Sequence, residues 1–175
     1  MRQRDPWDLA DPEATLAEIL ERSSVGMGEV VIARVDIETQ SVTGTRILKP
    51  PRDSAGGARS VDVLRKERER ARLSDRVRRV AEQLAPAREW DGYRWAAITG
   101  VFVTVVCREG RVVDAAADWL WLNAWRYSNH GRDAFDGDVY IMTPHGWSGI
   151  LDTRCGLAPA LGTTSQPQLR LLPGA

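Results

Sequence analysis

The spacing of apolar residues predicts a helix near the start of the chain. Leu16, Ile19 and Leu20 share one face of a helix that we expect over residues 12–22. Asp11 is a suitable N-cap because its short carboxylate accepts a hydrogen bond from the first turn. The helix should therefore bury one face against the rest of the domain.

Two strands are expected next, joined as a hairpin. Residues 31–37 alternate between apolar and more polar side chains, which is typical of a half-buried strand. The polar turn 38–41 separates them from a second strand over 42–48. The prolines and glycines of residues 49–57 indicate a loop after this hairpin.

The longest helix is expected over residues 58–85. Leu73, Val77, Val80 and Leu84 recur every three or four residues and form a narrow apolar stripe. Residues 88–94 read as a connector that carries Trp90 and Tyr93. A buried strand follows, with residues 101–106 apolar on nearly every position.

The last third of the domain repeats the alternation of helix and strand. We expect a helix over 115–128 with Asp114 as its cap, then a strand over 136–143 with which residues 148–151 pair. The order is thus helix, two strands, helix, strand, helix, and a final strand or hairpin. This order predicts a single α/β or α+β domain with a mixed sheet and three main helices.

The domain should cover residues 1–156, with a flexible tail over 157–175. The tail is rich in proline, glycine, threonine and glutamine, a composition typical of poorly ordered ends. At 175 residues and 43% hydrophobic composition, the chain has enough apolar surface for one core.

Composition excludes several classes of protein and predicts no cofactor. The 24 basic and 24 acidic residues balance, so no global field attracts nucleic acid or an anionic membrane. The two cysteines form no CxxC pair, which excludes a zinc ribbon. No apolar stretch is long enough for a bilayer, and the acidic N-terminus is unlike a signal peptide, so we expect a cytoplasmic protein.

Local charge leaves nucleic-acid binding as one alternative. The arginines of the long helix lie three or four residues apart and share a face that is suited to phosphates. They are Arg65, Arg68, Arg72, Arg76 and Arg79. The competing interpretation is a solvated helix whose arginines pair with neighbouring glutamates.

Tryptophan density favours a non-enzymatic domain that binds another protein or itself. Trp121 and Trp125 lie one turn apart on the third helix, and exposed tryptophans with arginine are typical of interface hot spots. The expected binding surface comprises Trp121, Trp125, Arg126, His130, His145 and Trp147. The alternative is that the tryptophans pack in the core.

Both histidines fall in residues 125–147, which makes this segment a candidate metal site of a hydrolase. His130, His145 and an aspartate such as Asp138 form a ligand set that suits zinc or iron, although no HExxH or HxH spacing supports it. A nucleophile, Ser148 or Cys155 beside His145, is a weaker reading because no GxSxG motif surrounds it. Without chemistry, the segment is a helix end, an aspartate-rich turn, a strand and a second turn.

The order of elements over roughly residues 29–152 resembles that of RadC/JAB-type domains. In that family the buried strand leads into a histidine-rich zinc motif followed by a serine and an aspartate. Here the corresponding stretch is TVVCREGRVVD, in which Asp114 or the later Asp118 matches the aspartate position and both histidines are absent. The resemblance implies an analogy of fold rather than a shared catalytic site.

Overall fold

A computed structural model describes residue 5, residues 7–49 and residues 63–162, with the side chains of 63–66 outside the description. In this part of the chain, three helices surround one mixed sheet, which confirms the expected fold class and order of elements. The elements are α1 (Pro12–Ser23), β1 (Val30–Asp36), β2 (Val42–Leu48), α2 (Val63–Leu84), β3 (Gly100–Cys107), α3 (Trp119–Arg126), β4 (Phe135–Thr143), β5 (Gly146–Gly149) and β6 (Cys155–Gly156).

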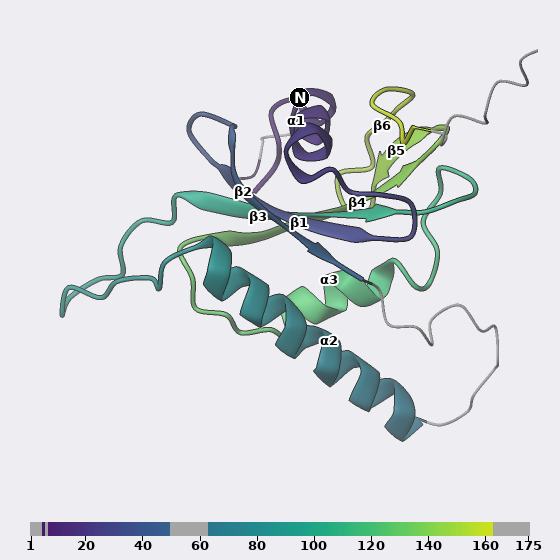
Figure 1. Cartoon of the computed structure of the whole chain (residues 1–175). Coiled ribbons are helices and arrows are strands. Elements are labelled where there is room, and N and C mark those ends of the chain that lie inside the picture. Colours follow the sequence, from purple (N-terminus) through teal and green to yellow (C-terminus); the bar gives the residue numbers. More distant parts are fainter. Residues whose placement is uncertain (1–4, 6, 50–62, 163–175) are drawn as a thin grey trace, which may run out of the picture.

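The strands lie in the order β2-β1-β3-β4-β5-β6. Only β3 and β4 are parallel neighbours, and α3 makes the crossover between them; the other described pairs are antiparallel. In Figure 1, α1 lies on one face of the sheet, and α2 and α3 lie on the other. The result is a three-layer arrangement that buries both faces of the central strands.

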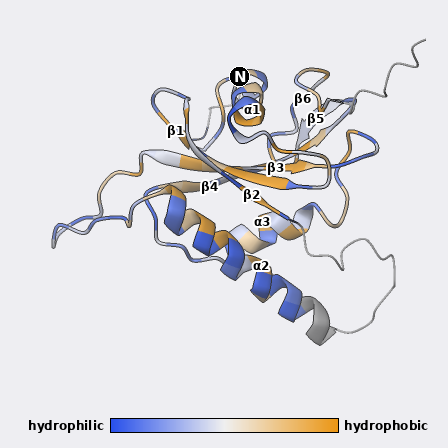
Figure 2. Ribbon diagram, in the orientation of Figure 1, coloured by the Kyte–Doolittle hydropathy of each residue, from blue (hydrophilic) through white to orange (hydrophobic). Residues whose placement is uncertain are grey.

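Alternation along β1 sends successive side chains into two separate cores. Ile32 faces α2 and α3, where it belongs to the cluster of Val77 and Trp125. Its neighbour Val31 faces α1 and belongs to the cluster of Leu16. Figure 2 shows the corresponding pattern, with hydrophobic central strands between the layers and a largely hydrophilic α2.

The first helix forms as its caps predict. The Asp11 side chain accepts a hydrogen bond from Ala14 N at 3.1 Å, and Pro12 opens the first turn. Ser24 adopts a left-handed conformation with φ of 51° and ends the helix.

The third helix is shorter than the predicted 115–128, and Asp114 is not its cap. The helix starts at Trp119, because residues 115–118 form a turn in which Asp118 N donates to Ala115 O. The carboxylate of Asp118 is buried and accepts from Arg108 Nη2 at 3.0 Å and from Ala115 N at 2.8 Å. The ion pair with Arg108 therefore organises the chain between β3 and α3.

Packed chain continues beyond residue 157, where a flexible tail was expected to begin. Leu161 is buried on the α1 side of the sheet, and its N–H donates to Thr143 O at 3.0 Å. The Trp147 indole N–H donates to Ala158 O at 2.8 Å. These contacts anchor residues 157–162, while the rest of the expected tail, 163–175, lies outside the described residues.

The other boundaries differ by a few residues from those expected. The predicted start of the long helix at 58–62 lies outside the described residues, and its end at Leu84 agrees with the prediction. The strand that pairs with β4 is β5, which begins two residues earlier than the predicted 148–151. Among the described helices, none has the length and apolar character needed to cross a membrane.

Candidate functional site

The two histidines lie at opposite ends of one strand. His130 precedes β4 and His145 follows it, and β4 is nine residues long. At about 3.3 Å per residue, the strand separates them by roughly 25 Å, whereas two ligands of one zinc ion each lie about 2 Å from the metal. In the described part of the chain, no group of three histidine, cysteine or acidic side chains is placed to hold a metal ion. The described structure therefore does not bring the alternative ligand set of His130, His145 and Asp138 together at one metal ion.

His130 has a structural role at the start of β4. Its side chain is 9% exposed, and its Nε2 lies 2.7 Å from Oδ1 of Asp136. Nδ1 accepts a hydrogen bond from Arg132 N at 3.0 Å. The ring meets Phe102 and Trp125 edge to face at 5.2 and 5.7 Å. These contacts fix the loop between α3 and β4.

The nucleophile hypothesis finds no support at the other end of the strand. His145 is exposed in the turn after β4, and its backbone N–H donates to Thr143 Oγ1 at 3.0 Å. In the described structure its ring has no bond to Ser148 or Cys155, which pair with each other across β5 and β6. Burial raises the pKa of the Cys107 thiol to about 12, so this thiol is a core residue and not a nucleophile.

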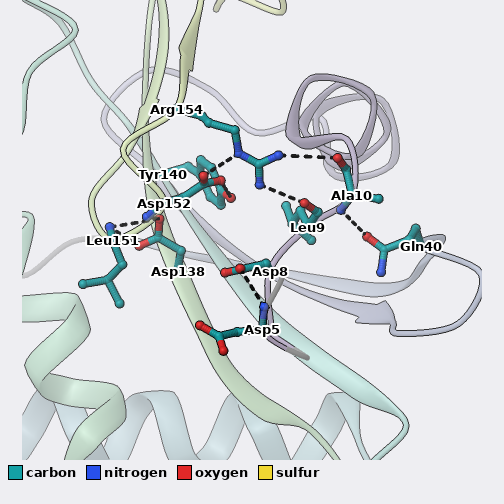
Figure 3. Close-up of polar contacts among 10 residues, drawn as sticks. All are labelled: Asp5, Asp8, Leu9, Ala10, Gln40, Asp138, Tyr140, Leu151, Asp152 and Arg154. Carbon is teal, nitrogen blue, oxygen red and sulfur yellow. Dashed lines mark hydrogen bonds and ion pairs between the residues drawn. The ribbon is translucent and has the colours of Figure 1, made fainter. Parts of the chain in front are cut away.

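Asp138 belongs to a buried polar network that joins strand ends. Its carboxylate accepts from the backbone N–H groups of Val139, Leu151 and Asp152 at 2.7 to 3.1 Å. Figure 3 shows this carboxylate beneath the turn that contains Asp152. Tyr140 donates its hydroxyl hydrogen to Asp152 Oδ2 at 2.7 Å, and burial together with this bond raises the pKa of the phenol. The donors that surround Asp138 are backbone groups, so its role is structural.

Arg154 extends this network to the N-terminal segment. Its guanidinium pairs with Asp152, and it donates to Leu9 O at 2.8 Å and Ala10 O at 3.4 Å (Figure 3). Ala10 N in turn donates to Gln40 Oε1 at 2.7 Å. The network thereby holds residues before α1 against the turn between β5 and β6.

We predict that Asp138 gives the protein a component of stability that weakens as pH rises. Burial raises the pKa of its carboxyl above the ordinary 3.8, so between the two pKa values the folded state binds the proton more tightly than the unfolded state. This component is complete below 3.8 and is lost as pH rises through the folded pKa.

Urea unfolding of wild type and Asp138→Asn across this pH range measures that component. The free energy of unfolding of wild type, minus that of the variant, should increase as pH falls from neutral towards 3.8. A difference that instead decreases on acidification would contradict the assignment.

The expected binding surface around Trp121 and Trp125 is not exposed. These side chains are 4% and 2% exposed, because both project from the face of α3 that packs against the sheet. Trp125 stacks on Phe102 with ring centroids 5.0 Å apart and donates its indole hydrogen to Thr104 Oγ1 at 2.7 Å. Trp147 is likewise buried, and of the expected surface only Arg126 and His145 are exposed. The tryptophans of this set are core residues.

The arginines expected to form a phosphate-binding face on α2 are partly exposed and partly engaged in contacts within the chain. Arg76 donates to Lys49 O at 2.6 Å, and Arg70 and Arg78 pair with acidic neighbours. Arg68, Arg72 and Arg79 are exposed, whereas the side chain of Arg65 lies outside the described residues. Four acidic side chains lie between residues 67 and 84, so the solvated-helix interpretation accounts for much of this charge.

Three of the exposed aromatic residues instead gather in and just after residues 88–94, the segment that the sequence pattern presented as a connector. Residues 88–98, here named the aromatic hairpin, fold back on themselves through an antiparallel bridge between Trp90 and Trp95. The two indoles are 51% and 53% exposed, with ring centroids 5.3 Å apart and planes inclined by 55°. Tyr93 at the tip is 89% exposed. The hairpin projects beyond the sheet at the side where β3 begins (Figure 1).

The tip of the aromatic hairpin is a tight turn held by Asp91. Its Oδ1 accepts hydrogen bonds from the N–H groups of Tyr93 and Arg94 at 2.8 and 2.7 Å. These two bonds lower the pKa of the Asp91 carboxyl. Gly92 has φ of 93°, a conformation that glycine adopts without strain. The turn therefore fixes the direction in which Tyr93 projects.

The base of the aromatic hairpin is clamped by the loop that contains His130. Arg88 N donates to Gly131 O at 3.1 Å on one arm. On the other arm, Thr99 donates its N–H and its hydroxyl hydrogen to the two carboxylate oxygens of Asp133, each at 2.7 Å. Segment 125–147, the candidate active site of the sequence, thus positions the hairpin.

Arg34 of β1 completes the clamp. Its Nη2 lies 3.5 Å from Asp133 Oδ2 and donates to Thr99 Oγ1 at 2.8 Å. A Cβ at Gly100 would lie 2.6 Å from Arg34 Nε, so the Arg34 guanidinium packs directly over the point where the hairpin enters β3. The hairpin is thereby attached to β1, the neighbour of the strand that it enters.

A signal for this hairpin is present in the sequence. The stretch EWDGYRW places an Asp-Gly pair between aromatic residues, and Asp-Gly is a strong short-range indicator of a hairpin turn. Its strands are too short to show an alternating pattern of their own. This is why a reading based on periodicity assigned the segment to a connector.

Comparisons with protein-family models, curated proteins and solved structures find no match to this chain. The likeness to RadC/JAB-type domains accordingly concerns the order of elements alone, and no residue role follows from it.

Proposed function

We propose that the protein is a non-enzymatic domain that binds another protein through the aromatic hairpin. The observation that carries this proposal is the exposure of Trp90, Tyr93 and Trp95 on one short projection. Tryptophan and tyrosine are enriched among the hot-spot residues of protein interfaces. Burying these rings against a partner would remove a large apolar area from water.

The fixed conformation of the aromatic hairpin supports the same proposal. Asp91 holds the tip and Asp133 holds the base, so the three rings keep their relative positions before a partner arrives. A preorganised surface binds more tightly because less conformational entropy is lost on association. A merely structural connector would gain nothing from two exposed indoles.

We place this activity in the cytoplasm. Cys107 and Cys155 are both free thiols, which suits a reducing compartment. A partner other than a second copy of the chain and self-association both fit the surface, and size-exclusion chromatography over a range of protein concentrations separates them.

A triple variant, Trp90→Ala with Tyr93→Ala and Trp95→Ala, tests the proposal. Immobilised wild-type protein should retain a defined set of proteins from a lysate of its own source, or a second copy of itself. The triple variant should lose that retention, with affinity reduced by at least ~30-fold, the equivalent of one hot-spot residue of about 2 kcal/mol.

Trp119→Ala is the matched control. Trp119 is 42% exposed on α3, outside the aromatic hairpin, so this variant should retain the same partner as wild type. Circular dichroism should show all three proteins folded, since the replaced rings are exposed. Equal retention by wild type and the triple variant would overturn the proposal.

A further inference from the structure

The strand β2 forms one edge of the sheet, and within the described residues no strand pairs with its outer side. Ile37 N donates to Thr99 O, so the odd-numbered residues of β1 bond to β3 and the even-numbered residues bond to β2. Their partners in β2 are the even-numbered residues of Gly44–Leu48. The backbone N–H and C=O groups of Thr45 and Ile47 therefore point outward, away from the sheet.

The protein covers part of this open edge with its own charged side chains. The exposed Arg46 guanidinium donates to Thr45 O at 2.9 Å, and Glu18 accepts from Val42 N at 3.2 Å. In the described part of the chain, the N–H of Thr45 and both backbone groups of Ile47 have no hydrogen-bond partner. These groups can pair with the backbone of an added strand.

One face of α2 runs alongside β2. Gln83 Oε1 accepts from Arg46 Nε at 3.1 Å, and Arg76 Nη2 donates at 2.6 Å to the carbonyl of Lys49, the residue that follows the strand. Gln83 and Arg76 are seven residues apart, which is about two turns of the helix. The face that carries them therefore follows β2 from its middle to its end.

This face of α2 carries unpaired positive charge. Arg72 and Arg79 lie one turn before and one turn after Arg76; both are exposed, and within the described residues neither has an ion pair or hydrogen bond. With Arg46 of the strand they form the basic row, which comprises Arg46, Arg72, Arg76 and Arg79. Glu69 lies one turn before Arg72, so the surroundings of the row remain net positive.

A strand added to β2 would send alternate side chains to the two faces of the sheet. Residues bonded to Thr45 and Ile47 would lie on the α1 side, because Ile47 pairs with Val31 of the α1-side core. There they would meet the side chain of Ile47, which is 40% exposed. The residues between them would lie on the α2 side with Arg46, which pairs with Ile32 of the other core. Apolar residues suit the first set of positions, and carboxylates suit the second.

We propose that the open edge of β2 binds an extended segment of another protein in which acidic residues alternate with β-branched apolar residues. The backbone of the segment pairs with Thr45 and Ile47, and its carboxylates pair with the basic row. This site is separate from the aromatic hairpin, and it goes beyond the proposed function.

The basic row disfavours the other occupants of such an edge. Antiparallel pairing of two β2 strands would place both α2 helices on the same face of the joined sheet, so the basic rows of two copies would repel each other. A nucleic acid would meet the row with its phosphates, but these groups accept hydrogen bonds and leave the carbonyl of Ile47 without a donor. An acidic strand satisfies both the charge and the backbone groups.

An end-blocked peptide of alternating glutamate and valine is the probe. Calorimetric titration of the full-length protein should show binding that weakens as salt is added, since the ion pairs are exposed. The amide protons of Thr45 and Ile47 should become protected from hydrogen exchange in the complex. A peptide with the same residues in two separate blocks should bind at least ~10-fold more weakly.

Two N-methylated forms of the peptide test the strand pairing itself. In the proposed register the valine N–H groups donate to β2, whereas the glutamate N–H groups face away from it. Methylation of the valine nitrogens should therefore weaken binding by at least ~10-fold, and methylation of the glutamate nitrogens should leave it unchanged. Both forms carry the same charge, so attraction to the basic row alone cannot separate them.

Protein variants test the basic row. Arg72→Glu with Arg79→Glu should fold as wild type, because both side chains are exposed, and should weaken peptide binding roughly 10-fold. Arg111→Glu with Arg126→Glu changes the net charge equally at exposed positions away from β2 and should bind as wild type. The triple alanine variant of the aromatic hairpin should also bind the peptide as wild type.

Failure of the alternating peptide to bind would refute the inference, as would equal binding of its two N-methylated forms. Unchanged affinity in Arg72→Glu with Arg79→Glu would remove the basic row from the site. If single-stranded oligothymidylate binds more tightly than the peptide and this variant loses it, the row belongs to a nucleic-acid site instead. Loss of the peptide in the triple alanine variant would show that the two surfaces are not separate.

Discussion

Replacing Trp125 by alanine is expected to lower the free energy of unfolding by about 3–5 kcal/mol, the usual cost of truncating a buried aromatic side chain. Trp125 is 2% exposed, stacks on Phe102 and forms an edge contact with His130. The truncation also leaves the buried Thr104 hydroxyl without its indole donor, which adds to the cost of the cavity.

Urea denaturation of Trp125→Ala, followed by far-ultraviolet circular dichroism, measures this loss. Trp119→Ala serves as its control, because this exposed ring lies on the same helix and should cost less than about 1 kcal/mol. If the two variants were equally stable, α3 would not pack as described. An exposed Trp125 would also be consistent with the protein-binding surface on α3 that the sequence pattern predicted.

Replacing Asp133 by alanine is expected to destabilise the protein by about 3 kcal/mol, because it leaves a largely buried arginine without its counter-ion. The Arg34 side chain is 11% exposed, and its nearest carboxylate oxygen belongs to Asp133 at 3.5 Å. The same substitution removes both acceptors of Thr99 at the base of the aromatic hairpin. The hairpin should therefore lose its fixed orientation along with the stability.

Two measurements test this prediction. Thermal unfolding should show the loss of stability in Asp133→Ala, and the circular dichroism signal of the coupled Trp90–Trp95 pair should fall as the hairpin loosens. Asp75→Ala is the control, since Asp75 pairs with Arg78 on the surface with both side chains about half exposed, and it should cost at most ~1 kcal/mol. An Asp133→Ala protein as stable as the control would show that the clamp contributes no stability.

The clamp also explains why residues 125–147, which contain both histidines, resembled a catalytic or metal site in the sequence. Polar side chains gather there because a loop, a strand and the hairpin base meet, and each buried N–H group needs an acceptor. Asp133 accepts a hydrogen bond from Thr99 N, His130 accepts one from Arg132 N, and Asp138 accepts one from Leu151 N in the turn after β5. Such residues are difficult to distinguish from a catalytic set by type alone.

The sequence by itself determined the kind of fold and most of its elements. The period of two in residues 31–37 and the stripe from Leu73 to Leu84 are local properties of the chain, and they remain valid wherever the element packs. Asp11 acts on neighbours within four residues, so its role as an N-cap was predicted. The Asp-Gly pair at 91–92 is an equally local signal, but the prediction rested on periodicity and missed the hairpin.

Only the tertiary structure decided which tryptophans are buried and which are exposed. Trp121 and Trp125 are covered because α3 lies against β3, whereas Trp90 and Trp95 are exposed because the hairpin extends beyond the sheet. The separation of His130 from His145 likewise follows from the nine residues of β4 that lie between them. Burial depends on neighbours that are distant in the sequence, and the spacing of residues within one segment carries no information about them.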